Sequence, residues 1–188
     1  MTEPLPAWGA RLISEFNSRD ELATSLAKGL SVEQLNWQPQ PGSWSIGQCL
    51  EHMAIGNEMY CRAISNALKQ QATGPVEEIR PKLFGRMFIR TYIEPREKLR
   101  KARAPRVVRP TARIEPSILD RFIRTSDEAR ELVHRARNHD VNRIRFKNPF
   151  VPVMNFTVGA AFEILSKHDL RHLLQADRVR KSPEFPSE

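Results

Sequence analysis

The chain has 188 residues, of which 40% are hydrophobic and 28% are charged. This length and balance predict one folded domain over residues 1–188 with a sizeable core, and they exclude a mainly disordered chain. No apolar run is long enough to cross a bilayer, and the first residues lack a basic segment followed by a hydrophobic one, so we expect a cytoplasmic protein.

Proline positions and hydrophobic spacing predict four long helices. Proline is rare inside helices, and four windows without it carry apolar residues at intervals of three and four. Ser45 with Gln48 three residues later is a capping-box pattern that marks the start of the second helix. The segment 141–150 is too polar and too short to anchor a sheet, so we predict an all-α fold, a four-helix bundle. The expected helices cover approximately residues 7–28, 46–70, 116–137 and 156–180.

A long basic connection, residues 72–115, is expected between the second and third helices. An apolar cluster from Leu83 to Ile93 predicts a short helix packed on the bundle. Proline residues interrupt the remainder of the connection. A connection of this length is uncommon unless it is functional or mobile.

The positive charge is concentrated in this connection. The formal net charge is +8, yet residues 80–113 hold twelve Lys and Arg against two Glu, a net +10 that leaves −2 for the other residues. Such a stretch is either a solvated connection or a surface for an anionic partner such as nucleic acid, phospholipid or an acidic protein. We favour the connection and do not expect nucleic acid, because residues 95–113 contain no aromatic ring on which a base would stack.

Polar residues interrupt the hydrophobic stripes of two helices. Arg19 and Asp20 interrupt the first helix, and Thr125 and Ser126 interrupt the third. These positions either border a polar pocket or mark places where the helices turn toward solvent. The sequence leaves both interpretations open.

Three histidines fall on the inward stripes of two helices. His168 and His172 are four residues apart, which places both imidazoles on one helix face. His52 lies on the inward stripe of the second helix. Together the three rings predict a metal site with an open position, which is typical of a catalytic rather than a closed structural metal. The alternative is a core of hydrogen-bonded histidines without a metal.

Several neighbours of the histidines have two open interpretations. Gln48, one turn before His52, and Gln175, after His172, either orient the ligands or fill buried polar space. Asp169 is rotated by about 100° from His168, which predicts a surface or interhelical ion pair rather than a ligand.

The cysteines and two tryptophans have structural interpretations. Cys49 and Cys61 lie twelve residues apart on one predicted helix, too far apart to form a disulfide, so we expect small buried thiols. A ligand role for Cys49 is the less favoured alternative. Trp37 and Trp44 flank the turn before the second helix, and we expect them to pack the loop rather than stack on a substrate.

The sequence resembles the DinB-like superfamily, also described as YfiT-like metal-dependent hydrolases, over approximately residues 7–180. The resemblance lies in GSWSIGQCLEHM, PRVVRP and PFVPVMNFTVGAAFEILSKHDLRHLLQADRV. It implies an up-down-down-up bundle in which the second and third helices run parallel. It also implies a divalent metal held by His52, His168 and His172. Members are frequently homodimers, and relatives include low-molecular-weight thiol transferases and thiol-dependent isomerases.

Two functional hypotheses follow. The first is a metal-dependent hydrolase or thiol transferase that acts on a small-molecule substrate, with zinc, nickel or iron as the ion and a low-molecular-weight thiol as a candidate cosubstrate. The second is a non-catalytic metal-containing binding or sensor module that uses residues 80–113 for an anionic partner. No carboxylate falls on the inward stripes assigned to the second and fourth helices, so the sequence identifies no general base.

Overall fold

The computed structural model describes residues 4–69, 74–95, 104–151 and 153–187. Its long helices are α1 (Ala7–Ala27), α3 (Ile46–Ala67), α5 (Ile118–Ala136) and α6 (Val158–Arg180). The prediction of a mainly helical protein is therefore confirmed. Among the described residues, none of the helices is both long and apolar enough to cross a bilayer.

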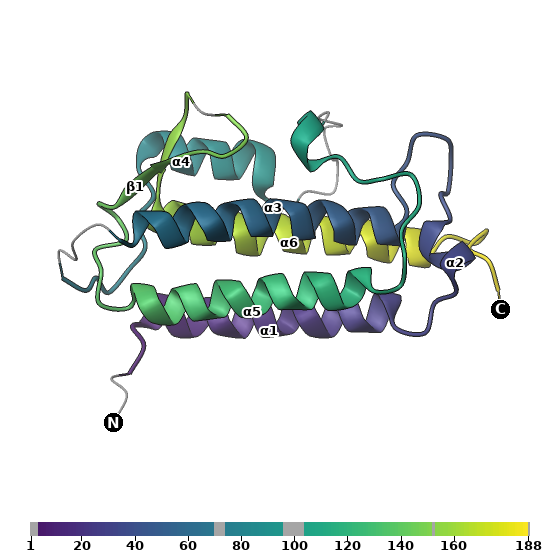
Figure 1. Cartoon of the computed structure of the whole chain (residues 1–188), viewed down its shortest axis with the longest axis horizontal. Coiled ribbons are helices and arrows are strands. Elements are labelled where there is room, and N and C mark those ends of the chain that lie inside the picture. Colours follow the sequence, from purple (N-terminus) through teal and green to yellow (C-terminus); the bar gives the residue numbers. More distant parts are fainter. Residues whose placement is uncertain (1–3, 70–73, 96–103, 152, 188) are drawn as a thin grey trace.

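The four long helices lie side by side along most of their lengths (Figure 1). α3 packs against both α5 and α6, and α1 packs against the same two helices. α1 and α6 run in one direction, while α3 and α5 run in the other (Figure 1). The core lies between them, and Phe16, Phe122 and Phe162 are among its largest fully buried side chains. The contact between α3 and α6 brings the histidines of these two helices to the same interface.

Side-chain caps define where two of these helices begin. Ser45 Oγ accepts a hydrogen bond from the backbone N–H of Gln48 at 3.1 Å, and Gln48 Oε1 accepts one from the N–H of Ser45 at 3.2 Å. This is the capping box that the sequence predicts for α3. Thr157 caps α6 in the simpler way, with only its own side chain accepting. Both caps satisfy N–H groups that have no partner within the helix.

Short helical segments occupy the connections. α2 (Val32–Asn36), which the sequence analysis did not predict, follows α1 and begins with a capping box of its own. α4 (Leu83–Phe88) continues into a π-helical turn, η1 (Ile89–Ile93), and together they form the helix predicted from the apolar cluster. A 3₁₀ turn, η2 (Arg106–Val108), precedes α5. Residues 72–73 and 96–103 of the predicted basic connection lie outside the described ranges.

One small sheet corrects the all-α prediction. β1 (Arg145–Lys147) and β2 (Asn155–Thr157) pair antiparallel, with Phe146 opposite Phe156. Phe156 is buried, and its ring centroid lies 5.1 Å from that of Phe88. The pairing depends on a tertiary contact with the segment α4–η1, so three-residue strands form where the local sequence alone is too short and polar to indicate them.

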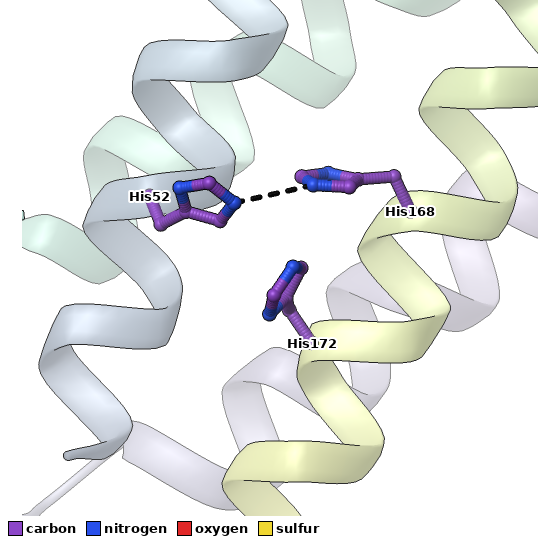
Figure 2. Close-up of side chains that lie close together, drawn as sticks. All are labelled: His52, His168 and His172. Atoms are coloured by element: carbon purple, nitrogen blue, oxygen red, sulfur yellow. Dashed lines mark hydrogen bonds between the residues drawn. The ribbon is translucent and has the colours of Figure 1, made fainter. Parts of the chain in front are cut away.

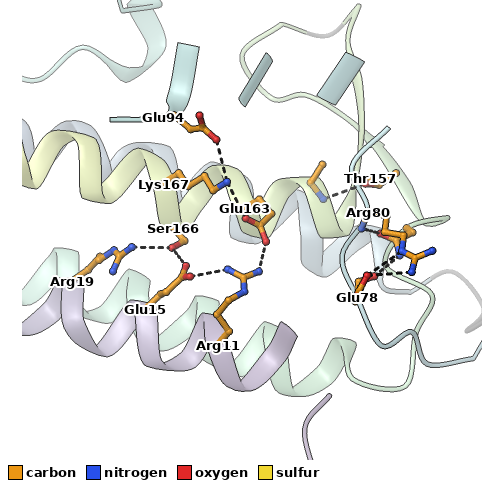
Figure 3. Close-up of polar contacts among 12 residues, drawn as sticks. Arg11, Glu15, Arg19, Glu78, Arg80, Glu94, Thr157, Glu163, Ser166 and Lys167 are labelled. Atoms are coloured by element: carbon orange, nitrogen blue, oxygen red, sulfur yellow. Dashed lines mark hydrogen bonds and ion pairs between the residues drawn. The ribbon is translucent and has the colours of Figure 1, made fainter. Parts of the chain in front are cut away.

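A chain of polar contacts joins α1, α6 and the end of η1 (Figure 3). Glu94 directly follows η1, so this chain fixes η1 over α6. Hydrogen bonds lower the pKa of Glu15 below its usual value, although burial, the largest single influence, acts to raise it. The chain runs through Arg19, Ser166, Glu15, Arg11, Glu163, Lys167 and Glu94.

Candidate metal centre

The three predicted histidines come together between α3 and α6. His52 of α3 and His168 and His172 of α6 point toward one another (Figure 2). One ring nitrogen from each lies within 4.8 Å of the other two. The Nε2 atoms of His52 and His168 are 3.2 Å apart. Two nitrogens bound tetrahedrally to one zinc ion at about 2.0–2.1 Å would be about 3.3 Å apart, so this separation suits a shared ion.

The outer nitrogens of two rings are held by hydrogen-bond acceptors. Nδ1 of His52 lies 2.7 Å from the carbonyl oxygen of Val108, and Nδ1 of His172 lies 3.1 Å from Oε1 of Gln175. A carbonyl oxygen can only accept, so each Nδ1 carries the hydrogen in these bonds. The Nε2 atom of each ring is then left with a free lone pair. Orientation of a ligand histidine through its second nitrogen is typical of metal sites.

Burial favours the neutral form of all three rings. Desolvation lowers the pKa of His168 to about 3, with further lowering from the nearby His52 and Arg171. Desolvation also lowers the pKa of His172 well below its usual value. The pKa of His52 is lowered by the same cause, although its bond to Val108 opposes the shift. Neutral imidazole is the form that binds metal ions, so the donor set fits a divalent cation.

Trp44 covers one side of the three histidines. Its ring centroid lies 4.7 Å from that of His52 and 5.6 Å from that of His172. Trp37 instead packs edge-on against Phe185, with centroids 5.5 Å apart. The sequence treated the two tryptophans alike, whereas the structure places only Trp44 beside the candidate metal centre.

The two glutamines occupy different surroundings. Gln175 contacts His172 directly. The side chain of Gln48 completes the cap of α3 at Ser45, and its Nε2 donates to the carbonyl oxygen of Thr111 at 3.1 Å. Gln48 therefore joins the start of α3 to the connection before α5, and its hydrogen bonds in the described part of the chain do not include a histidine.

Asp169 is a buried carboxyl group, which contradicts a surface ion pair. Its side chain is fully buried, and its Oδ2 accepts a hydrogen bond from Asn57 Nδ2 at 3.0 Å. Its Oδ1 lies 4.0 Å from Nδ1 of His168, beyond hydrogen-bond length. Burial raises the pKa of Asp169 to about 8. At this turn of α6 the predicted inward stripe passed through His168, whereas the fully buried residue is Asp169, one position later. The stripe that is buried steps by four and three through Val158, Phe162, Leu165, Asp169, His172, Ala176 and Val179.

Asp169 belongs to a buried polar layer that crosses the helices. Asn57 Nδ2 also contacts Thr125 Oγ1 at 3.3 Å. Thr125 and Ser126 are 4% and 1% exposed, so the polar interruption in α5 faces the interior rather than solvent. On α1, Arg19 lies near enough for its charge to lower the pKa of Asp169 against the effect of burial. The interpretation in which α5 turns toward solvent at these two residues is therefore wrong.

The cysteines lie away from the histidines. Cys49 and Cys61 are free thiols with no exposed surface. Cys49 packs among the apolar residues near the start of α3, and burial raises its pKa to about 12. These surroundings suit the small buried thiol that the sequence analysis favoured.

A cavity of about 340 Å³ opens beside the three histidines. Ile93 of η1 and three residues of the following connection, Ala104, Pro105 and Val108, form part of its wall. The connection that the sequence marks as basic thus contributes apolar side chains to the candidate site. This placement leaves room for a small molecule next to the three Nε2 atoms.

A mainly helical fold with three neutral histidines facing a cavity defines a candidate metalloprotein. The sequence profile of the DinB superfamily matches residues 16–176, and the chain belongs to this superfamily. The matched range contains all three histidines and the connection before α5. Comparisons with curated proteins and with solved structures gave no significant match.

Proposed function

We propose that His52, His168 and His172 hold a divalent metal ion through Nε2 and that the protein is a metal-dependent enzyme. The observation that carries this proposal is the convergence of the three rings, two of which are oriented by acceptors at Nδ1. Zinc, nickel and iron all suit imidazole ligands. A site built only as a packed core would not need a cavity next to these nitrogens.

The reaction is of the hydrolase or low-molecular-weight thiol transferase type. A divalent ion at this position supplies Lewis acidity toward an oxygen or sulfur ligand. The protein's own residues orient the ligands through Val108 and Gln175, and Trp44 shields the histidines from bulk water. The cavity admits a small-molecule substrate, with a thiol as the candidate cosubstrate.

The proposal includes the family's up-down-down-up bundle as a single domain over residues 1–188. The opposite directions of α1 and α6 relative to α3 and α5 support this layout (Figure 1). The homodimer implied by the resemblance stays a prediction, which sedimentation equilibrium of the metal-loaded protein tests.

Elemental analysis of the purified protein tests the metal site. We expect a stoichiometric divalent metal in the wild type, its loss after chelation, and its absence from His52→Ala. His134→Ala is the matched control, because His134 is an exposed histidine on α5. Retention of metal by His52→Ala, or absence of metal from the wild type after reconstitution, would contradict the proposal.

Activity is tested separately, with a panel of thiols and electrophiles. The metal-loaded wild type is expected to be active and His168→Ala inactive. Equal activity of the two proteins would remove the catalytic proposal even if the metal site were present.

The non-catalytic alternative assigns residues 80–113 to an anionic partner. Lys82 and Arg86 are exposed beside Leu83 and Met87, which are 75% and 56% exposed, and this combination supports it. Two results together would favour this alternative. The metal-loaded protein would be inert in the panel, and its binding to a labelled polyanion would weaken as the salt concentration increases.

A further inference from the structure

We propose that the cavity beside the histidines binds an elongated, apolar, ring-containing small molecule whose far end carries a hydrogen-bond acceptor. The end of this molecule that lies near the histidines contacts a metal ion, and this contact rests on the proposed function. The fit of the molecule to the cavity does not rest on it.

The size and lining of the cavity support an apolar ligand. Its volume of about 340 Å³ is more than twice that of an engineered apolar cavity of about 150 Å³ that binds benzene. Ligand pockets with apolar walls discriminate against charged molecules, which would lose their hydration without compensation. Outside the histidines the wall consists mainly of aromatic and aliphatic side chains, including Trp44, Tyr60, Phe88, Phe150, Ile164 and Leu165.

The shape of the cavity follows one face of α3. His52, Gly56 and Tyr60 line it at intervals of four residues. Eight residues of an α-helix span about 12 Å, so the cavity wall extends from the histidines along about two turns. A ligand that fills this length is elongated, with one end near His52 and the other near Tyr60.

Gly56 leaves space in the middle of this wall. Glycine inside a helix costs about 0.5–1 kcal/mol relative to alanine. A Cβ at position 56 would meet only His168 Cε1 and Phe150 Cζ, both at 4.0 Å, so close packing does not require glycine here. The glycine instead leaves this position of the cavity wall without a side chain, so that a ligand can approach the backbone of α3 beside His168 and Phe150.

Tyr60 provides the polar contact at the far end. Its hydroxyl oxygen accepts a hydrogen bond from Asn148 Nδ2 at 2.8 Å. The amide of Asn148 is fixed in this orientation, because its Oδ1 accepts from the N–H groups of Phe150 and Val151 at 2.8 and 2.9 Å. Since burial raises the pKa of Tyr60, the hydroxyl keeps its hydrogen and can donate it to a ligand.

Tyr92 marks the mouth of the cavity. It lines the cavity and is also 59% exposed, so its ring lies where the cavity meets solvent. Tyr92 therefore offers an aromatic ring at the entrance, while Arg171 is the one charged side chain in the cavity wall among the described residues.

Calorimetric titration of the metal-free protein with 2-naphthol and with phenol tests the cavity. Both probes are neutral at pH 7 and carry one hydroxyl, so they differ in ring area alone. We expect 2-naphthol to bind about tenfold more tightly than phenol, because the second ring adds buried apolar surface. Equal affinities, or no binding of 2-naphthol, would overturn the proposal.

Variants at Gly56 locate the binding. Gly56→Leu fills the space at position 56 and is expected to weaken 2-naphthol binding at least about tenfold, with a smaller loss in Gly56→Ala. Gly85→Ala is the control, because its added Cβ meets Ala160 and Phe156 at 3.7 Å and lies outside the cavity lining. Circular dichroism checks folding, and if Gly56→Leu is unfolded, Gly56→Ala and Tyr60→Phe carry the test. Unchanged affinity in folded Gly56 variants would place the ligand elsewhere and refute the proposal.

The end of the ligand that lies near the histidines is tested in cobalt-loaded protein with two thiols, benzyl mercaptan and 2-mercaptoethanol. Binding of either thiol is measured through the absorption of a thiolate bound to cobalt. We expect the wild type to prefer benzyl mercaptan about tenfold and Gly56→Leu to lose this preference while it still binds 2-mercaptoethanol. A protein that binds 2-naphthol but no metal would refute only the proposed function. A protein that binds metal but neither ring-containing probe would refute only the apolar cavity site.

Discussion

The Nδ1 atom of His52 lies 2.7 Å from the carbonyl oxygen of Val108, a bond that joins α3 to the connection before α5. Two further bonds fix the same connection: Thr111 Oγ1 donates to Glu51 at 3.0 Å, and the N–H of Ile114 donates to Asn36 at 2.8 Å. The final part of the basic connection is therefore anchored to the helices, and it determines how one candidate ligand is oriented.

Removal of the metal is expected to lower thermal stability. An ion that binds only the native state at a free concentration 100 times its dissociation constant contributes about 2.7 kcal/mol. For a protein of this size that corresponds to about 5–10 °C in Tm. Differential scanning calorimetry of zinc-loaded and chelated protein measures the difference. His172→Ala should have the same Tm with and without zinc, and a wild type that behaved in that way would speak against the metal site.

Substitution of the two glutamines is expected to separate orientation from capping. Gln175→Ala should weaken metal affinity about 10–100-fold, because Nδ1 of His172 loses its acceptor. Gln48→Ala should leave the affinity unchanged and lower the free energy of unfolding by about 1 kcal/mol, because the side-chain half of the capping box and the bond to Thr111 are lost. Chelator competition measures the metal affinity, and urea denaturation measures the free energy of unfolding. A weaker metal affinity in Gln48→Ala than in Gln175→Ala is the contrary result.

The carboxylate of Glu15 is expected to make stability depend on pH. Burial acts to raise the pKa of Glu15, but hydrogen bonds from Ser166 and Arg11 and the charges of Arg11 and Arg19 together lower the folded-state pKa below its unfolded value of about 4.5. The unfolded state therefore binds the proton more readily, so the stabilisation is complete above pH of about 4.5 and is lost as the pH falls through the folded-state pKa.

Glu15→Gln should accordingly cost about 1 kcal/mol at pH 7 and almost nothing in strong acid. Urea denaturation at several pH values measures this difference, and Glu21→Gln, an exposed position on the same helix, serves as the control. A cost of Glu15→Gln that stayed constant from pH 7 into strong acid would show that the carboxylate charge is not the cause.

Two glycines of α3 are expected to respond in opposite directions to alanine. A Cβ at Gly47 would lie 2.9 Å from Ile114 Cβ, so Gly47→Ala should destabilise the protein by about 1–3 kcal/mol through overpacking. Gly56→Ala has no such contact and should stabilise it by up to about 1 kcal/mol through helix propensity. Urea denaturation measures the free energy of unfolding of both variants. Destabilisation by Gly56→Ala would indicate that the space at position 56 is smaller than the structure shows.

The sequence by itself determined the four long helices and the candidate ligands. Proline positions and capping residues such as Ser45 act within a few residues, so the helix ends are encoded locally. The four-residue spacing of His168 and His172 fixes their common face for the same reason. His52 could be assigned to them because its helix also has an inward stripe.

Only the tertiary structure decided what surrounds those ligands. The acceptor for His52 comes from residue 108, far along the chain. Asp169, which the spacing placed off the inward stripe, is buried because α6 packs with this residue against Asn57 of α3. The β1–β2 pair and the cavity beside Gly56 likewise depend on contacts between distant segments. Helical periodicity fixes which residues share a face, but packing against neighbouring helices fixes which face is buried and what lies opposite it.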